Sequence, residues 1–105
     1  MTKARGWTDA VWARYQWIMQ QVEQRGPLNV LDDKFVDAYI REFSPPYRVK
    51  MFGANSCRQL GRDLSAMYRS ALLDRSRIGL IGAEPGFPKW VWVYQLRPDR
   101  GGERE

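Results

Sequence analysis

The sequence predicts an α+β domain in which three helices precede a C-terminal β-hairpin. Residues 8–24, 34–43 and 56–73 place apolar side chains three and four positions apart, which is the spacing of one helix face. Residues 89–96, KWVWVYQL, are rich in Val, Trp and Tyr, which favour strands. The Pro- and Gly-containing segment 83–88, AEPGFP, predicts the turn before that strand.

Length and composition indicate one folded, basic domain. The chain has 105 residues, of which 44% are hydrophobic, enough for a real core. We expect a single domain over 1–98 and a disordered charged tail over 99–105. The net charge of +5 favours polyanionic partners such as nucleic acid or an anionic membrane surface.

Residue usage argues against most enzyme chemistry. The chain has no histidine and one cysteine, Cys57, so it lacks the ligands of a structural zinc site and the residues of a Cys–His or Ser–His–Asp centre. Its carboxylates show no catalytic spacing, and Gly79 and Gly82 fit a hairpin better than a nucleotide loop. We therefore expect no enzyme activity, no cofactor and no metal, with Cys57 as a small packed hydrophobe.

The sequence also favours a cytoplasmic protein. Residues 1–10 have no apolar signal-peptide core, and no run approaches the roughly 18 apolar residues that a membrane span requires. A single cysteine is compatible with a reducing compartment. No membrane association or small-molecule ligand is predicted.

The first predicted helix, 8–24, carries more aromatic surface than one small core usually covers. Its core stripe is Val11, Tyr15, Ile18 and Val22. Three further large side chains widen or leave that stripe: Trp12, Trp17 and Met19. They either form a homodimer interface or are covered by the termini of the same chain, and the sequence does not choose between these alternatives.

The second predicted helix, 34–43, follows a short extended segment at 28–30. Gly26-Pro27 ends the first helix, and Ser44-Pro45-Pro46 ends the second. The segment 47–55 is long for a turn between two helices. It predicts either a short helical turn or a strand.

The third predicted helix, 56–73, has one apolar and one basic face. The apolar stripe consists of Leu60, Leu64, Met67 and Ala71, and Arg58, Arg62, Ser65 and Arg69 repeat the same spacing opposite it. Asn55 or Ser56 is expected to cap its start. The basic face is either a solvated surface or a binding surface. Asp63 on its flank is expected to pair locally with Arg62 or Gln59.

The element order and the local pattern of residues 56–96 resemble the winged helix-turn-helix family of DNA-binding proteins. SCRQLGRDLSAMYRSALLDRSRIGL is similar to a recognition helix that runs into the first wing strand, and PGFPKWVWVYQL is similar to a wing tip with its return strand. The resemblance extends over about residues 8–96 in element order. It implies a winged helix-turn-helix fold of three helices and a hairpin wing, and a small transcriptional regulator of prokaryotic or phage type.

The resemblance also implies how DNA would be bound. The basic helix would enter the major groove, where Arg58, Gln59 and Arg62 would face base edges. The remaining predicted contacts, mostly to phosphates, come from Ser56, Ser65, Arg69, Arg75, Arg77, Lys89, Arg48 and Lys50. Tyr68, Trp90 and Trp92 are expected in the core rather than as stacking platforms.

We therefore expect a sequence-specific double-stranded DNA-binding protein, acting as a repressor-like homodimer associated with the nucleoid. The alternative is a winged-helix protein–protein interaction module, or a small inhibitor or assembly factor, that does not bind DNA. RNA binding by the same basic surface is a third possibility.

Overall fold

The computed structural model describes residues 3–45, 48–51, 54–80 and 89–97. The elements, in chain order, are α1 (Asp9–Arg25), α2 (Asp33–Phe43), β1 (Arg48–Met51), β2 (Ala54–Cys57), α3 (Arg58–Arg69), β3 (Leu73–Gly79) and β4 (Trp90–Leu96). The predicted turn at 83–88 and the tail at 99–105 lie outside the described residues. Among the described helices, none combines the length and apolar character needed to cross a bilayer.

The three helices pack their apolar stripes into one core. The fully buried side chains come from every helix, and they include Ile18 of α1, Phe35 and Tyr39 of α2, and Leu64 and Met67 of α3. Thr8 caps α1 and Asp32 caps α2, each by accepting a backbone N–H three residues later. The predicted stripe of α1 is confirmed, as is the burial of Cys57. The stripe of α3 is confirmed at Leu60, Leu64 and Met67, whereas its fourth predicted member, Ala71, lies beyond the end of the helix.

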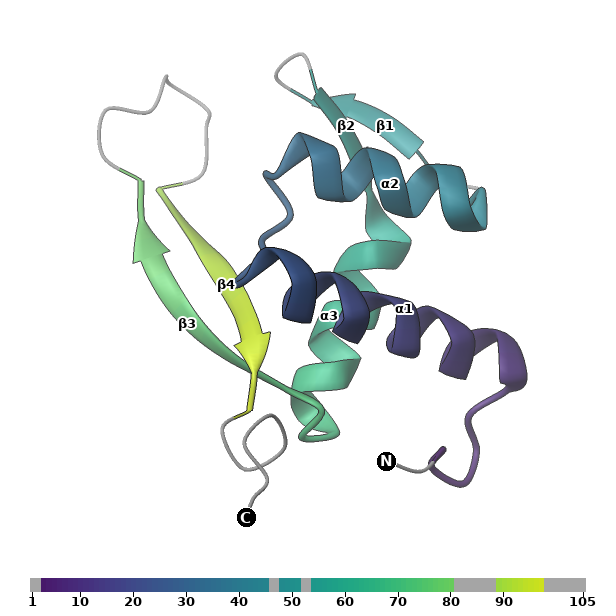
Figure 1. Ribbon diagram of the computed structural model, residues 1–105. Coiled ribbons are helices and arrows are strands. Elements are labelled where there is room, and N and C mark those ends of the chain that lie inside the picture. The colour runs from purple at the N-terminus through teal and green to yellow at the C-terminus, as the bar shows by residue number, and fades with distance from the viewer. Residues whose placement is uncertain (1–2, 46–47, 52–53, 81–88, 98–105) are drawn as a thin grey trace.

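The C-terminal hairpin lies beside the helices as a wing (Figure 1). β3 and β4 pair antiparallel, with Leu73 opposite Leu96 and Arg77 opposite Trp92. Leu28, between α1 and α2, bridges to Tyr94 of β4 through two backbone hydrogen bonds of 2.9 and 2.8 Å. Three helices followed by a C-terminal hairpin, with a one-residue strand contact between α1 and α2, form the predicted α+β, winged-helix layout.

A second hairpin lies between α2 and α3. The sequence predicted either a short helical turn or a strand for this segment. β1 and β2 pair antiparallel, with Arg48 opposite Cys57 and Met51 opposite Ala54. Figure 1 shows this hairpin next to α2 and apart from the wing. The helix-turn-helix connection is therefore an inserted hairpin instead of a tight turn.

The third helix is shorter than its periodicity predicted. Ser56 belongs to β2, so the predicted cap at Asn55 or Ser56 is wrong; the residue before α3 is Cys57, whose extended backbone supplies no side-chain cap. At the other end, Ala71 adopts a left-handed φ of 62°. The N–H groups of Ala71 and Leu72 bond back to Tyr68 and Met67 at 3.1 and 2.8 Å, which closes the helix before β3 begins.

The aromatic surplus on α1 packs within the chain. Trp17, predicted well off the stripe, lies 6.1 Å from Phe35 in a parallel stack and contacts Phe43 edge to face at 5.5 Å. Trp12 stacks on Trp7, and Met19 is half-buried against the core. Of the two alternatives, cover within the chain is therefore observed in part: α2 covers Trp17 and the N-terminal segment covers Trp12, and both side chains stay half-buried. A homodimer stays a prediction without a defined surface.

The left-handed Ala71 predicts a stabilising substitution. A left-handed backbone costs a residue with a Cβ about 1–2 kcal/mol, and glycine avoids this cost. Ala71→Gly should raise the free energy of unfolding by roughly 0.5–1 kcal/mol in urea denaturation, after the greater flexibility of glycine in the unfolded chain is subtracted. Ala66→Gly, inside α3, is the matched control and should lower it. A loss of stability in Ala71→Gly would contradict this account of the helix end.

Candidate nucleic-acid interface

The positive charge is concentrated in the C-terminal half. Residues 57–97 contain seven Lys or Arg against three Asp or Glu, whereas residues 3–45 contain six of each. The N-terminal half is therefore electrically balanced. The excess lies on α3 and the wing, which adjoin each other in space (Figure 1).

The outward face of α3 carries three exposed guanidinium groups. Arg58, Arg62 and Arg69 recur at helical spacing, and all three are exposed. They form no ion pair within the described part of the chain. This basic face, as predicted from the sequence, lies opposite the buried Leu60, Leu64 and Met67.

The one carboxylate of α3 points inward. Asp63 is 4% exposed and accepts a hydrogen bond from Arg14 Nε of α1 at 2.8 Å and from the Tyr39 hydroxyl of α2 at 2.6 Å. Gln59 Nε2 donates to the same hydroxyl at 2.9 Å. The expected local pairing of Asp63 with Arg62 is therefore wrong. A cluster that we call the Asp63 network (Arg14, Tyr39, Gln59 and Asp63) joins all three helices.

The network alters the acidity of its members. Burial, and then the Asp63 carboxylate, raise the pKa of the Tyr39 hydroxyl above its ordinary value. The hydrogen bond to Asp63 raises the pKa of the Arg14 guanidinium. Both groups therefore keep their protons, and α3 contributes no unpaired negative charge to its basic face.

The wing alternates arginines with aromatic rings. The Arg75 guanidinium lies 4.0 Å from the ring centres of both Tyr68 and Trp92, and that of Arg77 lies 5.2 Å from the ring centre of Trp90. Arg75 Nε is buried without a hydrogen-bond partner in the described structure. These contacts connect the C-terminal end of α3 to both strands of the wing.

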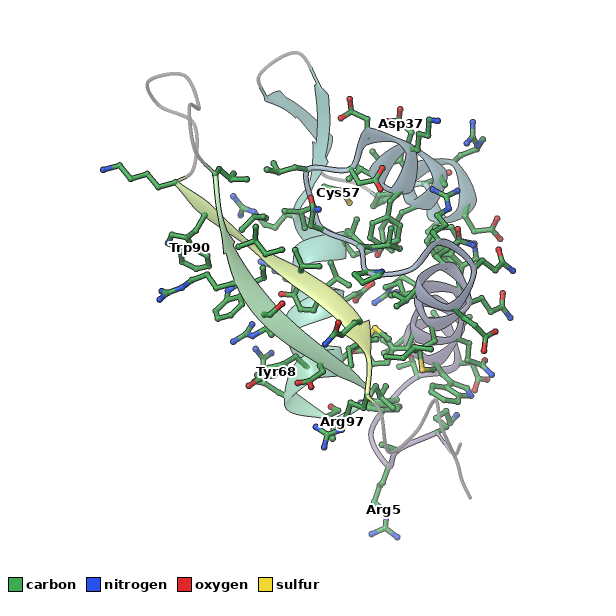
Figure 2. All side chains as sticks on the ribbon, turned by 60° about the vertical axis from the view of Figure 1, so that its left-hand side comes forward. Arg5, Asp37, Cys57, Tyr68, Trp90 and Arg97 are labelled. Carbon is green, nitrogen blue, oxygen red and sulfur yellow. The ribbon has the colours of Figure 1, made fainter. Side chains whose placement is uncertain are left out.

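Two of the three aromatics expected in the core are exposed. Tyr68 is 36% exposed and Trp90 is 42% exposed, while Trp92 is half-buried. Figure 2 shows Tyr68 and Trp90 on the same side of the molecule, away from Asp37 of α2. The alternation of Trp and Val in β4 predicted burial, but toward the wing tip the strand extends beyond the helices that would cover it.

The structure separates the remaining predicted contact residues into groups. Gln59 is half-buried, and one of its two amide N–H groups donates to the Tyr39 hydroxyl, which restrains the orientation of the amide. Ser65 is half-buried beside the wing, and Lys89 is exposed before β4. Arg48 and Lys50 lie on β1 and Ser56 on β2, in the inserted hairpin instead of on α3.

Arg14 and Tyr39 are the residues of this region that the sequence did not identify. Tyr39 is fully buried, and its hydroxyl partner Asp63 lies 24 positions later. Arg14 reaches Asp63 across 49 positions. The only local signal of this contact in the sequence is one charged residue beside the apolar stripe of α1 and another beside the apolar stripe of α3.

Comparison of the chain with protein-family models, curated proteins and solved structures gives no match. Among the described residues, no group of three or more Cys, Asp or Glu is placed to hold a metal ion. The candidate interface therefore rests on the geometry of α3 and the wing.

The raised pKa of Tyr39 predicts a pH-dependent contribution to stability. An unfolded tyrosine loses its proton near pH 10 while the folded Tyr39 keeps it, so stability from this group is present below about pH 10 and falls as the pH rises further. Tyr39→Phe removes this dependence together with a hydrogen bond to a carboxylate worth about 1.5–3 kcal/mol. Tyr39→Phe should therefore be less stable than the wild type, and this difference in unfolding free energy should become smaller between about pH 9 and 11. Urea denaturation at each pH measures it.

Tyr68→Phe is the matched control, because the exposed Tyr68 hydroxyl makes no hydrogen bond among the described residues. Its unfolding free energy should follow that of the wild type over the same pH range. A constant deficit in Tyr39→Phe across that range would contradict the raised pKa.

Proposed function

We propose that this protein binds double-stranded DNA through α3 and the wing and regulates transcription by occupying its site. The observation that carries the proposal is the purely cationic outward face of α3: Arg58, Arg62 and Arg69 are exposed, and Asp63 is turned inward and paired. The major groove is wide enough to admit an α-helix, and the positive charge of this face is attracted to the surrounding phosphates.

The adjoining wing extends the same surface. Arg77 and Lys89 are exposed on the wing, where a bound duplex would present its phosphates. We expect α3 and the wing to face the duplex, because residues 3–45 carry balanced charge and attract phosphates less strongly.

The residues divide by role. Arg58 and Arg62 are exposed on the N-terminal half of α3 and are suited to guanine, whose O6 and N7 accept a forked guanidinium. Arg69, Arg77 and Lys89 are suited to phosphates, which set position without reading sequence. Simple occupancy of a promoter, without an effector, is the mechanism that requires the fewest parts. Binding as a homodimer to two half-sites would multiply affinity and specificity.

Salt dependence provides the first test of this proposal. Fluorescence anisotropy with a fully paired duplex should show affinity that falls log-linearly with salt, because phosphate contacts release counterions. Replacing Arg58, Arg62 and Arg69 together by Ala should weaken binding at low salt. It should also reduce the steepness of the log–log plot by about 1, since Arg69 is the one of the three assigned to a phosphate and each phosphate that is no longer neutralised removes about 0.9 from the slope.

A second triple variant keeps the change in net charge the same. Arg5, Arg25 and Arg41 are exposed on the N-terminal half, and their replacement by Ala should leave most of the affinity and slope. Equal reductions in both variants would show attraction to net charge alone and would contradict the assignment to α3. Absence of duplex binding at low salt would favour the protein–protein interaction module.

A further inference from the structure

A groove runs between α3, the wing and the segment that joins α1 to α2. Its volume is about 290 Å³, near the lower limit of roughly 300–1,000 Å³ for small-molecule sites. Gly61 and Ser65 of α3 line it with little side-chain bulk, and Trp90, Trp92 and Tyr94 of β4 line it with aromatic rings. The groove therefore has room for one planar ring system beside other rings.

The aromatic lining is only partly used by the chain itself. Trp90 and Trp92 meet edge to face, with ring centres 5.1 Å apart and planes at 83°, so they form a corner instead of a closed stack. Val30 and Leu31, on the other side of the groove, are 38% and 37% exposed. Large apolar side chains exposed together around a concavity are typical of a binding site.

Charge narrows the choice of occupant. Arg62 follows the groove residue Gly61 on α3, and Arg69 lies one helical turn after the groove residue Ser65. The Arg75 and Arg77 guanidiniums stack on the same tryptophans that line the groove. An apolar peptide side chain would fit the rings but would have no counterpart for these cations. A nucleobase brings a flat apolar face and an anionic phosphate on each side of it, so it matches both features.

We propose that this groove binds one unpaired base projecting from a DNA strand that lies across α3 and the wing. This inference rests on the proposed function, because the same strand must be held by the arginines. Stacking on an aromatic ring does not depend on base identity, so the groove would recognise an unpaired or unstacked position instead of a sequence. A base that is already unpaired costs little to insert, whereas a paired base must first be extruded.

Three duplexes of one sequence isolate the contribution of the base. One is fully paired, one has a single unpaired thymine, and one has an abasic nucleotide in place of that thymine. The last two share the added backbone flexibility and differ only in the base. The wild type should bind the thymine bulge about tenfold more tightly than the abasic bulge in fluorescence anisotropy, within the range expected for stacking of one base.

Substitutions at Trp90 test which side chain is responsible. Trp90→Leu keeps an apolar side chain without a ring and should lose most of the preference for thymine over the abasic nucleotide. Trp90→Phe keeps an aromatic face and should retain the larger part of it. Ile78→Ala is the matched control, since Ile78 is 48% exposed on the wing but does not line the groove, and it should bind like the wild type.

The outcomes separate this inference from the proposed function. Equal affinity of the wild type for the thymine and abasic bulges would overturn the base site and leave duplex binding intact. The same holds if Trp90→Leu prefers the thymine bulge as strongly as the wild type does. Absence of binding to all three duplexes would overturn both. Free thymidine monophosphate should compete only weakly; competition as strong as that of the bulged duplex would overturn the assignment to a base within a strand.

Discussion

The buried ion pair between Asp63 of α3 and Arg14 of α1 fixes the orientation on which the rest of the surface depends. Its side chains are 6% and 19% exposed, and the Tyr39 hydroxyl of α2 donates to the same carboxylate. Removing one partner of such a pair costs about 3–5 kcal/mol, since the other charge is left uncompensated. Any rotation of α3 about its axis would break these bonds. The network therefore keeps the apolar stripe inward and the arginine face outward.

This arrangement also determines the electrostatics of the molecule. Because the single carboxylate of α3 is neutralised inside, Arg58, Arg62 and Arg69 act without a nearby opposing charge on their own helix. The wing adds the exposed Arg77 and Lys89 to this positive charge and carries the exposed ring of Trp90. Phosphate attraction and ring stacking would then act on one ligand, which is the combination that proteins binding unpaired nucleic acid use.

Periodicity predicted the helices, because a local repeat specifies which face of an element is buried, and the β-forming residues of 89–96 predicted the wing. It did not predict the ends of α3, which depend on the left-handed Ala71 and on the extended Cys57. Nor did it predict the partners of Asp63 or the cover over Trp17, since these contacts join residues far apart in the chain. Trp90 and Tyr68 were expected in the core, but Trp90 begins β4 near the wing tip and Tyr68 lies on the exposed side of α3, and both are exposed.

The central claim is that α3 and the wing form one surface that binds DNA. Chemical-shift mapping of the ¹⁵N-labelled protein, titrated with a fully paired duplex at low salt, tests it residue by residue. Backbone amide shifts should change most in α3, residues 58–69, and on the wing in β3 and β4. Changes concentrated on α2, residues 33–43, or spread evenly over the surface, would contradict it.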